Sequence, residues 1–200
     1  MARDLQYQVL DVLARALGRR VYPGPTPDWL IRPGRAECQT RWRTTRLIYG
    51  RLTDGMELPD EMPIREWREV DGVIGGRATP LRLVEVDESQ HFNEYRALTL
   101  EAYPKEVALG FPKRVWLAES RRRRAQGGGG WARPKPPLFP MDGDRHRQRA
   151  FRDALADLVP PLHGYAPTLR IADFEVEPWI WDHRGAITRL RGLVEEWLAM

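Results

Sequence analysis

The chain is poor in cysteine, with Cys38 alone among 200 residues. One cysteine excludes an intramolecular disulfide and any zinc site built from several cysteines. The sequence also lacks an apolar run near the roughly 18 residues that would span a bilayer, which excludes a transmembrane protein. The N-terminus, Met1-Ala2-Arg3-Asp4, has no apolar leader and carries an early acid, so we expect a protein of the reducing cytoplasm without a membrane partner.

Lysine is the second scarce residue: the chain has 3 Lys and 29 Arg. Arginine presents a planar fork that fits phosphate and base edges, although GC-rich codon usage also raises arginine content. The positions of these charges are more informative. Residues 113–149 hold 11 basic and 3 acidic residues, whereas the rest of the chain carries a net charge of −4. Concentrated positive charge on a mildly acidic body predicts a polyanionic partner.

The spacing of apolar residues predicts helices that alternate with strands. Steps of three and four residues predict helices over 3–17, 36–50, 91–102, 145–159 and 183–199. Alternation with a period of two predicts strands over 66–74, 81–87 and 168–176. This order of elements favours an α/β fold in which a small mixed β-sheet is flanked by helices.

Proline and glycine mark the segments between these elements. They predict loops over 22–33, 52–63 and 119–143, the last of them a mobile basic loop. We expect a single domain over 1–200. It comprises N-terminal helices and loops (1–65), a core (66–176) and a C-terminal helix (177–200).

Three acids lie on the two predicted central strands. Side chains alternate along a strand, so Glu85 and Asp87 share one face while Val84 and Val86 occupy the other. If the two strands pair as a hairpin, Asp71 lies beside the two acids.

Three carboxylates that converge at one end of a sheet repel one another unless a cation neutralises them. Carboxylate oxygens suit Mg²⁺ or Mn²⁺, and such an ion can activate water and stabilise charge on a phosphodiester. The same acids also fit an edge strand that is kept soluble by charge.

The residues around these acids resemble the PD-(D/E)XK nuclease superfamily. Asp71 precedes an apolar-turn-apolar hairpin, and Glu85 and Asp87 fit the Glu-x-(Asp/Lys) pattern of the second strand. The continuation from Val84 to His91 (VEVDESQH) is similar to the variant in very short patch repair endonucleases, where an acid-rich segment ending in His follows the catalytic strand.

The later part of the chain resembles the same superfamily. A helix that opens with Asp144, followed by a strand over 168–176, is similar to the closing helix–strand pair of that fold. The resemblance covers about residues 66–176 and implies a restriction-endonuclease-like core.

The resemblance also implies roles for individual residues. It makes Asp71 and Glu85 metal ligands. Asp87 stands where most members have a Lys that positions or activates the water, so this chain departs from the pattern there. An Asp at that position is expected to be a third metal ligand, which leaves Gln90 or His91 to orient the nucleophile.

Two groups of arginines are the predicted nucleic-acid contacts. The run Arg121, Arg122, Arg123 and Arg124 lies beside four glycines and suits phosphate contacts by a flexible arm. Arg145 and Arg149 are four residues apart on a predicted helix, so they share a face that can grip one phosphate strand.

The predicted function is therefore a Mg²⁺- or Mn²⁺-dependent endonuclease that hydrolyses phosphodiester bonds, with DNA as the expected substrate. Two alternatives remain open. One is a catalytically inactive nucleic-acid-binding module on the same fold. The other is a subunit of a defence or mobile-element complex that contacts a partner subunit through its Trp-rich C-terminus. A homodimer through the terminal helix would suit an enzyme that cuts both strands.

Overall fold

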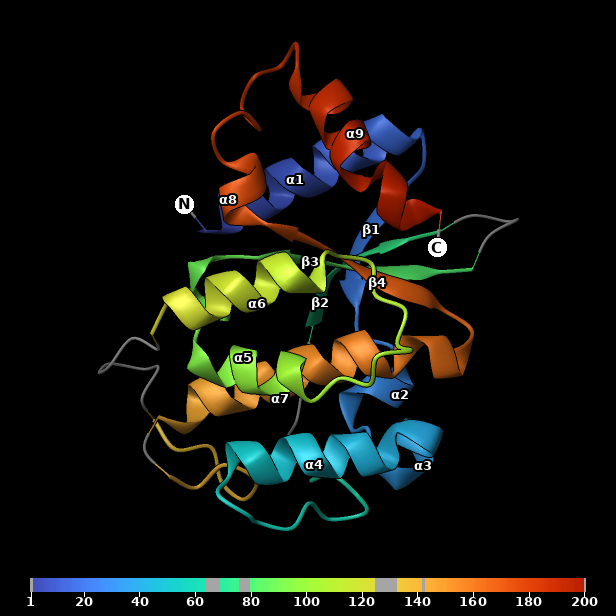
Figure 1. Ribbon diagram of the computed structural model, residues 1–200. Helices are drawn as coiled ribbons and strands as arrows, with labels where there is room; N and C mark the ends of the chain where they lie inside the picture. The colour runs from blue at the N-terminus through green and yellow to red at the C-terminus, as the bar shows by residue number, and fades with distance from the viewer. Residues whose placement is uncertain (1, 64–68, 76–79, 125–132, 142, 200) are drawn as a thin grey trace.

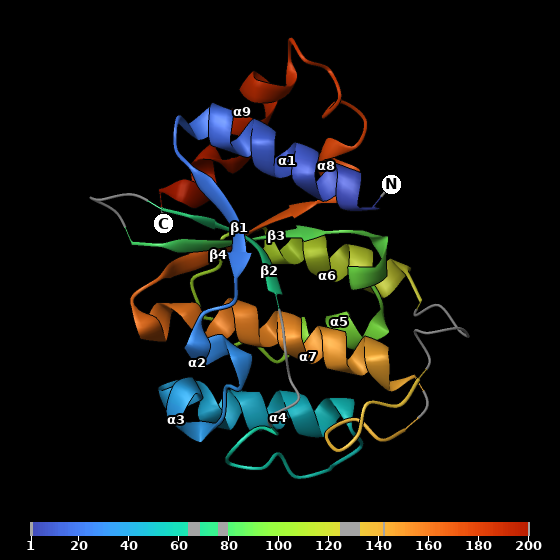
Figure 2. The same cartoon turned by 180° about the vertical axis from the view of Figure 1, so that it is seen from behind.

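The computed structural model describes residues 2–63, 69–75, 80–124, 133–141 and 143–199. It has an α/β fold in which a four-stranded mixed sheet carries helices on both faces, as predicted (Figures 1 and 2). The strands lie in the order β1 (Val21–Pro25), β2 (Glu69–Ile74), β3 (Arg82–Asp87) and β4 (Ala166–Ala172). β1, β2 and β3 pair antiparallel, whereas β3 and β4 pair parallel.

The helices form layers above and below this sheet (Figure 1). The upper face carries α1 (Ala2–Leu17), α8 (Asp173–Val176) and α9 (Ala186–Leu198). The lower face carries α5 (Glu94–Glu101), α6 (Lys113–Arg122) and α7 (Asp144–Leu158). Beneath them lie α2 (Asp28–Ile31), α3 (Arg35–Cys38) and α4 (Trp42–Leu52). Among these helices, each within the described part of the chain, none combines the length and apolar character needed to cross a membrane.

Alternation along β3 divides the apolar interior into two cores. Val84 and Val86 belong to the upper core, which α1 and α9 complete, whereas Leu83 belongs to the lower core. All three side chains are buried. Full burial of such a side chain stabilises the fold by about 1.5–3 kcal/mol, so both faces of this strand hold the layers together.

The predicted loop over 22–33 is wrong in part, because β1 occupies its first residues and α2 lies within it. Proline lacks an N–H and rarely enters a central strand, but an edge strand tolerates it. β1 is the edge of this sheet, and its register against β2 shifts between Tyr22 and Gly24, on either side of Pro23. The bulge absorbs the proline without ending the strand.

The predicted basic loop over 119–143 is also wrong at its start, because α6 continues to Arg122. Trp116 and Ser120 are buried and give this helix an inner face. The glycine run and Trp131 fall within 125–132, outside the described residues.

Three further boundaries differ from the prediction. The helix over 36–50 is divided into α3 and α4 by a turn at Gln39, whose φ is 43°. The strand over 168–176 ends at Ala172, because the Glu175 side chain accepts the Ala172 N–H and begins α8. The helix over 91–102 begins later, because Asn93 accepts the N–H groups of Tyr95 and Arg96 as the cap of α5. This cap leaves His91 on the turn between β3 and α5.

Candidate functional site

Two of the three predicted acids meet at the end of the β2–β3 pair. The register pairs Gly72 with Val84, and Asp71 and Glu85 follow on the two strands. The Asp71 carboxylate accepts the N–H of Val86 at 2.7 Å, which fixes its position beside β3. Glu85 is buried, although a side chain of its type is usually exposed.

Asp71 and Glu85 line a cleft with a volume of about 910 Å³. Five polar side chains of α7 line the same cleft and recur at steps of one, three and four residues: Arg145, Gln148, Arg149, Arg152 and Asp153. Lys135 adds a further positive charge from the segment before α7. The cleft therefore combines carboxylates from the sheet with cations from a helix. The predicted contacts Arg145 and Arg149 are part of it.

Burial and mutual repulsion change the acidity of this pair. Burial of Asp71 and, after it, the negative charge of Glu85 raise the pKa of Asp71 to about 7. The hydrogen bond from the Val86 N–H lowers this pKa but is outweighed. A positive charge close to Asp71 would therefore favour its ionised form.

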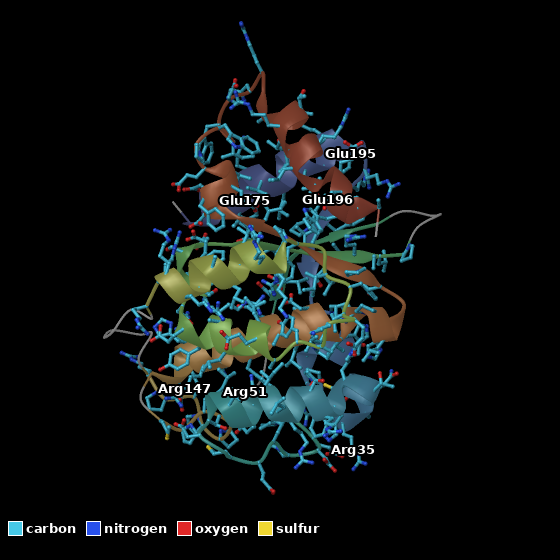
Figure 3. The ribbon with its side chains drawn as sticks, in the orientation of Figure 1. Arg35, Arg51, Arg147, Glu175, Glu195 and Glu196 are labelled. Atoms are coloured by element: carbon cyan, nitrogen blue, oxygen red, sulfur yellow. The ribbon has the colours of Figure 1, made fainter. Side chains whose placement is uncertain are left out.

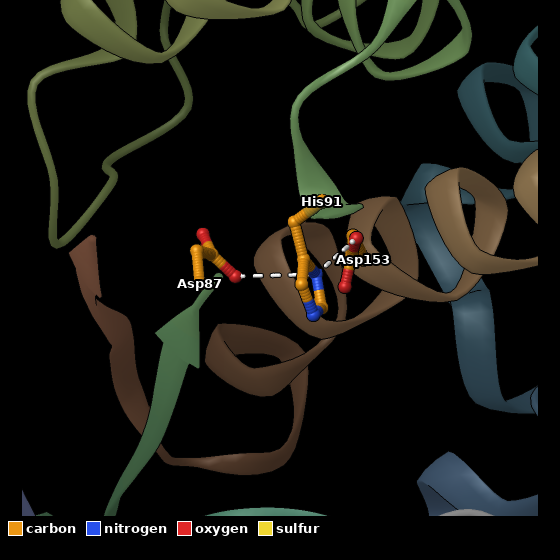
Figure 4. Close-up of side chains that lie close together, drawn as sticks. All are labelled: Asp87, His91 and Asp153. Carbon is orange, nitrogen blue, oxygen red and sulfur yellow. Dashed lines mark hydrogen bonds and ion pairs between the residues drawn. The ribbon is translucent and has the colours of Figure 1, made fainter. Parts of the chain in front are cut away.

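His91 lies at the same cleft and is held by two carboxylates (Figure 4). Its Nδ1 lies 3.1 Å from Asp153 Oδ2 and 3.4 Å from Asp87 Oδ1. Burial lowers the pKa of His91, but the charge and hydrogen bond of Asp153, together with the charge of Asp87, outweigh it and raise the pKa. Because both carboxylates contact Nδ1, they orient the ring and leave Nε2 on its opposite edge.

The structure places Asp87 apart from the Asp71–Glu85 pair, in a buried polar network. One of its oxygens accepts the Trp116 indole N–H at 2.6 Å, and the other accepts Arg170 Nη1 at 2.6 Å. Ligand atoms of Asp87, His91 and Asp153 lie within 4.8 Å of one another, a spacing that can hold a metal ion. Arg170 already supplies positive charge at that point.

Sequence reasoning missed most of this network, which joins β4, α5 and α7. Arg170 Nε donates to Asp157 at 2.6 Å, and Arg96 Nη2 donates to the other oxygen of Asp157 at 2.7 Å. Three acids (Asp87, Asp153 and Asp157) face two arginines, so a protonated His91 brings the formal charge of the group to zero. The available signal was Arg170 itself, since it is a charged residue between Leu169 and Ile171 in an apolar strand.

The remaining predicted residues are divided between the cleft and the surface. Gln90 lines the cleft and donates to Glu88 at 2.9 Å. Arg121 and Arg122 lie on α6, where they pair with Glu101 and Glu119.

The other two arginines of this run follow the end of α6. Arg123 pairs with Glu119 and lies over the Phe92 ring, while Arg124 is exposed. Arg121 thus links α6 to α5, whereas the ion pairs of Arg122 and Arg123 are local to α6 and its end.

Comparisons with known proteins give no further guide: no family model, no curated protein and no solved structure matches the chain.

Proposed function

We propose that the protein is a metal-dependent nuclease with a restriction-endonuclease-like core, and that it hydrolyses phosphodiester bonds in DNA. The observation that carries this proposal is the mixed charge of one cleft. Two carboxylates from adjacent strands, the half-buried Asp71 and the buried Glu85, share it with three arginines of α7. Metal-dependent hydrolysis of a phosphodiester combines a cation site with groups that hold the phosphate.

The carboxylate pair fits a divalent cation. Asp71 and Glu85 offer oxygen ligands of the kind that Mg²⁺ and Mn²⁺ prefer, and the pKa of Asp71 is raised by its burial and by the charge of Glu85, an effect that a bound cation would offset. When bound, the ion would supply Lewis-acid stabilisation of the charge that develops on the phosphodiester. Asp87 is not required as a ligand, because Arg170 and Trp116 engage both of its oxygens.

The α7 arginines would hold the phosphates. Arg145, Arg149 and Arg152 lie on one side of the helix and reach the same cleft, so they can contact neighbouring phosphates of one strand. Guanidinium groups bind phosphate through two parallel hydrogen bonds, which orients as well as attracts it.

His91 would move the proton in place of the lysine found in most members of the superfamily. Asp153 holds Nδ1, so Nε2 is the ring atom that can exchange a proton with the reactants. Because Asp153 and Asp87 raise the pKa of His91 and favour the protonated ring, Nε2 would donate a proton to the leaving oxygen. Gln90, on the same turn, can hydrogen-bond to the attacking water.

Cleavage of supercoiled plasmid tests the proposal. We expect the purified full chain to nick or linearise plasmid with Mg²⁺ and to lose this activity with a chelator. Asp71→Asn and Glu85→Gln should each lower the rate by at least about a hundredfold. Glu195→Gln, at an exposed acid of α9, is the matched control and should cut at the wild-type rate. Cleavage that persists in Glu85→Gln would place the active site elsewhere.

The α7 arginines also favour a second candidate, a module that binds nucleic acid without cutting it. That protein would bind DNA in the presence of a chelator, and each phosphate it neutralises would add about −0.9 to the slope of log K against log salt. DNA binding that is lost in Arg145→Gln/Arg149→Gln, combined with no cleavage under any metal, would favour this candidate.

A further inference from the structure

A second groove lies at the opposite end of the molecule from α9, between α4 and the segment that follows it. Its volume is about 610 Å³. Arg43, Arg46, Leu47 and Gly50 line it from α4 at steps of three and four residues, and therefore from one face of that helix. Figure 3 shows Arg51 at this end of the molecule and Glu195 and Glu196 at the other.

The rim of this α4 groove is strongly basic. Arg43, Arg46 and Arg51 are exposed, and Glu57 is the one acid among the described residues that line it. Within the described part of the chain, none of the three arginines forms an ion pair. Three guanidinium groups on one rim attract carboxylates and can bind them through paired hydrogen bonds.

The floor of the α4 groove is aliphatic. Leu47 is 49% exposed and Met56 is 38% exposed, and both are among the most exposed large apolar side chains described. Methionine adapts its shape and is common at surfaces that bind peptides. A floor of Leu and Met suits apolar side chains of a protein, whereas bases of a nucleic acid stack on aromatic rings. Trp42 also lines the groove, but it is half-buried and packs against the lower core.

Gly50 keeps this floor open. It lies inside α4, where glycine costs about 1 kcal/mol relative to alanine. A Cβ at this position would meet no neighbouring atom within 4 Å, so packing within the described chain does not require a glycine. The space above Gly50 is available to an incoming side chain.

We propose that the α4 groove binds a segment of a partner protein that presents Asp or Glu beside aliphatic side chains. The carboxylates would pair with Arg43, Arg46 and Arg51, and the aliphatic side chains would enter over Gly50 between Leu47 and Met56. This inference is independent of the proposed nuclease activity, because the groove shares no lining residue with the cleft.

Selection from a random library of displayed 16-residue peptides tests the inference with the full chain as bait. The enriched peptides should be net negative and carry Leu, Ile or Met. One enriched peptide, labelled with fluorescein, is then measured by fluorescence anisotropy. We expect binding to weaken at least about tenfold in Gly50→Leu, which fills the floor, and in Arg43→Gln/Arg46→Gln, which removes rim charge.

Two controls make the outcome decisive. Arg20→Gln/Arg189→Gln removes two exposed arginines elsewhere and should bind like wild type. Thermal melts followed by circular dichroism should show Gly50→Leu to be at least as stable as wild type, because leucine favours a helix more than glycine does.

Several results would overturn the proposal. The first is that the enriched peptides show no excess of acidic residues. The second is that the labelled peptide binds Gly50→Leu as tightly as wild type. The third is that the chain self-associates and that Gly50→Leu abolishes this self-association. A dT16 oligonucleotide whose binding Gly50→Leu abolishes would instead identify a nucleic-acid groove.

Discussion

Removal of Arg170 is the sharpest test of the buried network. The Arg170→Met substitution keeps most of the aliphatic stem and deletes the charge. The side chain is fully buried, and it donates at 2.6 Å to Asp87 and to Asp157. Breaking a buried ion pair by removing one partner costs about 3–5 kcal/mol, since the other charge is left without compensation. The free energy of unfolding of a whole domain is only about 5–15 kcal/mol.

Urea unfolding followed by tryptophan fluorescence measures this loss. With a slope of about 2 kcal/mol per molar urea, the midpoint should fall by about 1.5–2.5 M at pH 8. The deficit should shrink as the pH falls. His91 and Arg170 hold the pKa of Asp153 well below its usual range despite burial, so removal of Arg170 raises this pKa and protonation of Asp153 then replaces part of the missing charge.

A matched substitution at the surface gives the control. Arg121→Met breaks the exposed pair with Glu101, in which the two side chains are 62% and 36% exposed, and should change the free energy of unfolding by at most about 1 kcal/mol. A midpoint for Arg170→Met within about 0.5 M of wild type at pH 8 would refute the argument that the network stabilises the fold through charge.

Two further predictions concern single positions. Burial raises the pKa of Glu175 to about 7, although the hydrogen bond from the Ala172 N–H lowers it. Because the pKa of Glu175 is higher in the folded state than in the unfolded state, the free energy of unfolding falls as the pH rises from about 4.5 through 7. Between pH 5 and 8, the free energy of unfolding of wild type should therefore fall by about 1 kcal/mol relative to that of Glu175→Gln. Equal pH dependence of the two unfolding curves would contradict this. Gly34→Ala should lower the melting temperature, because its Cβ would lie 2.3 Å from the Asp60 carbonyl oxygen. In Gly192→Ala, in α9, the added Cβ meets no atom within 4 Å, so this substitution should raise the melting temperature through helix propensity. An equal effect of the two alanine substitutions on the melting temperature would contradict the packing argument.

The helices with a clear apolar face could be predicted from the sequence. In α7, Phe151, Ala154, Leu155 and Leu158 recur at helical spacing, and all are buried. β1 could not be predicted, because its two prolines are compatible with a strand only at a sheet edge, and local pattern does not reveal the edge. No part of α6 was predicted, because its arginines resemble those of a solvated segment, while Trp116 and Ser120 supply the burial.

The Asp71–Glu85 part of the candidate site followed from the predicted hairpin, since both residues line one cleft as that pairing implied. The position of Asp87 in the buried network could not be predicted in this way. Its partners, Trp116 and Arg170, lie 29 and 83 residues away in sequence, and only tertiary packing brings them to it. Asp153 was missed for the same reason, although it lies on a helix whose existence was predicted.

The pairing of α1 with α9 has a consequence for synthesis on the ribosome. Both helices cover Val84, Val86, Leu169 and Ile171, although they come from opposite ends of the described chain. These apolar side chains therefore stay exposed on the nascent polypeptide until α9 has left the exit tunnel. We expect chains arrested before residue 186 to be handed to chaperones or to aggregate, even though the lower core could already have closed.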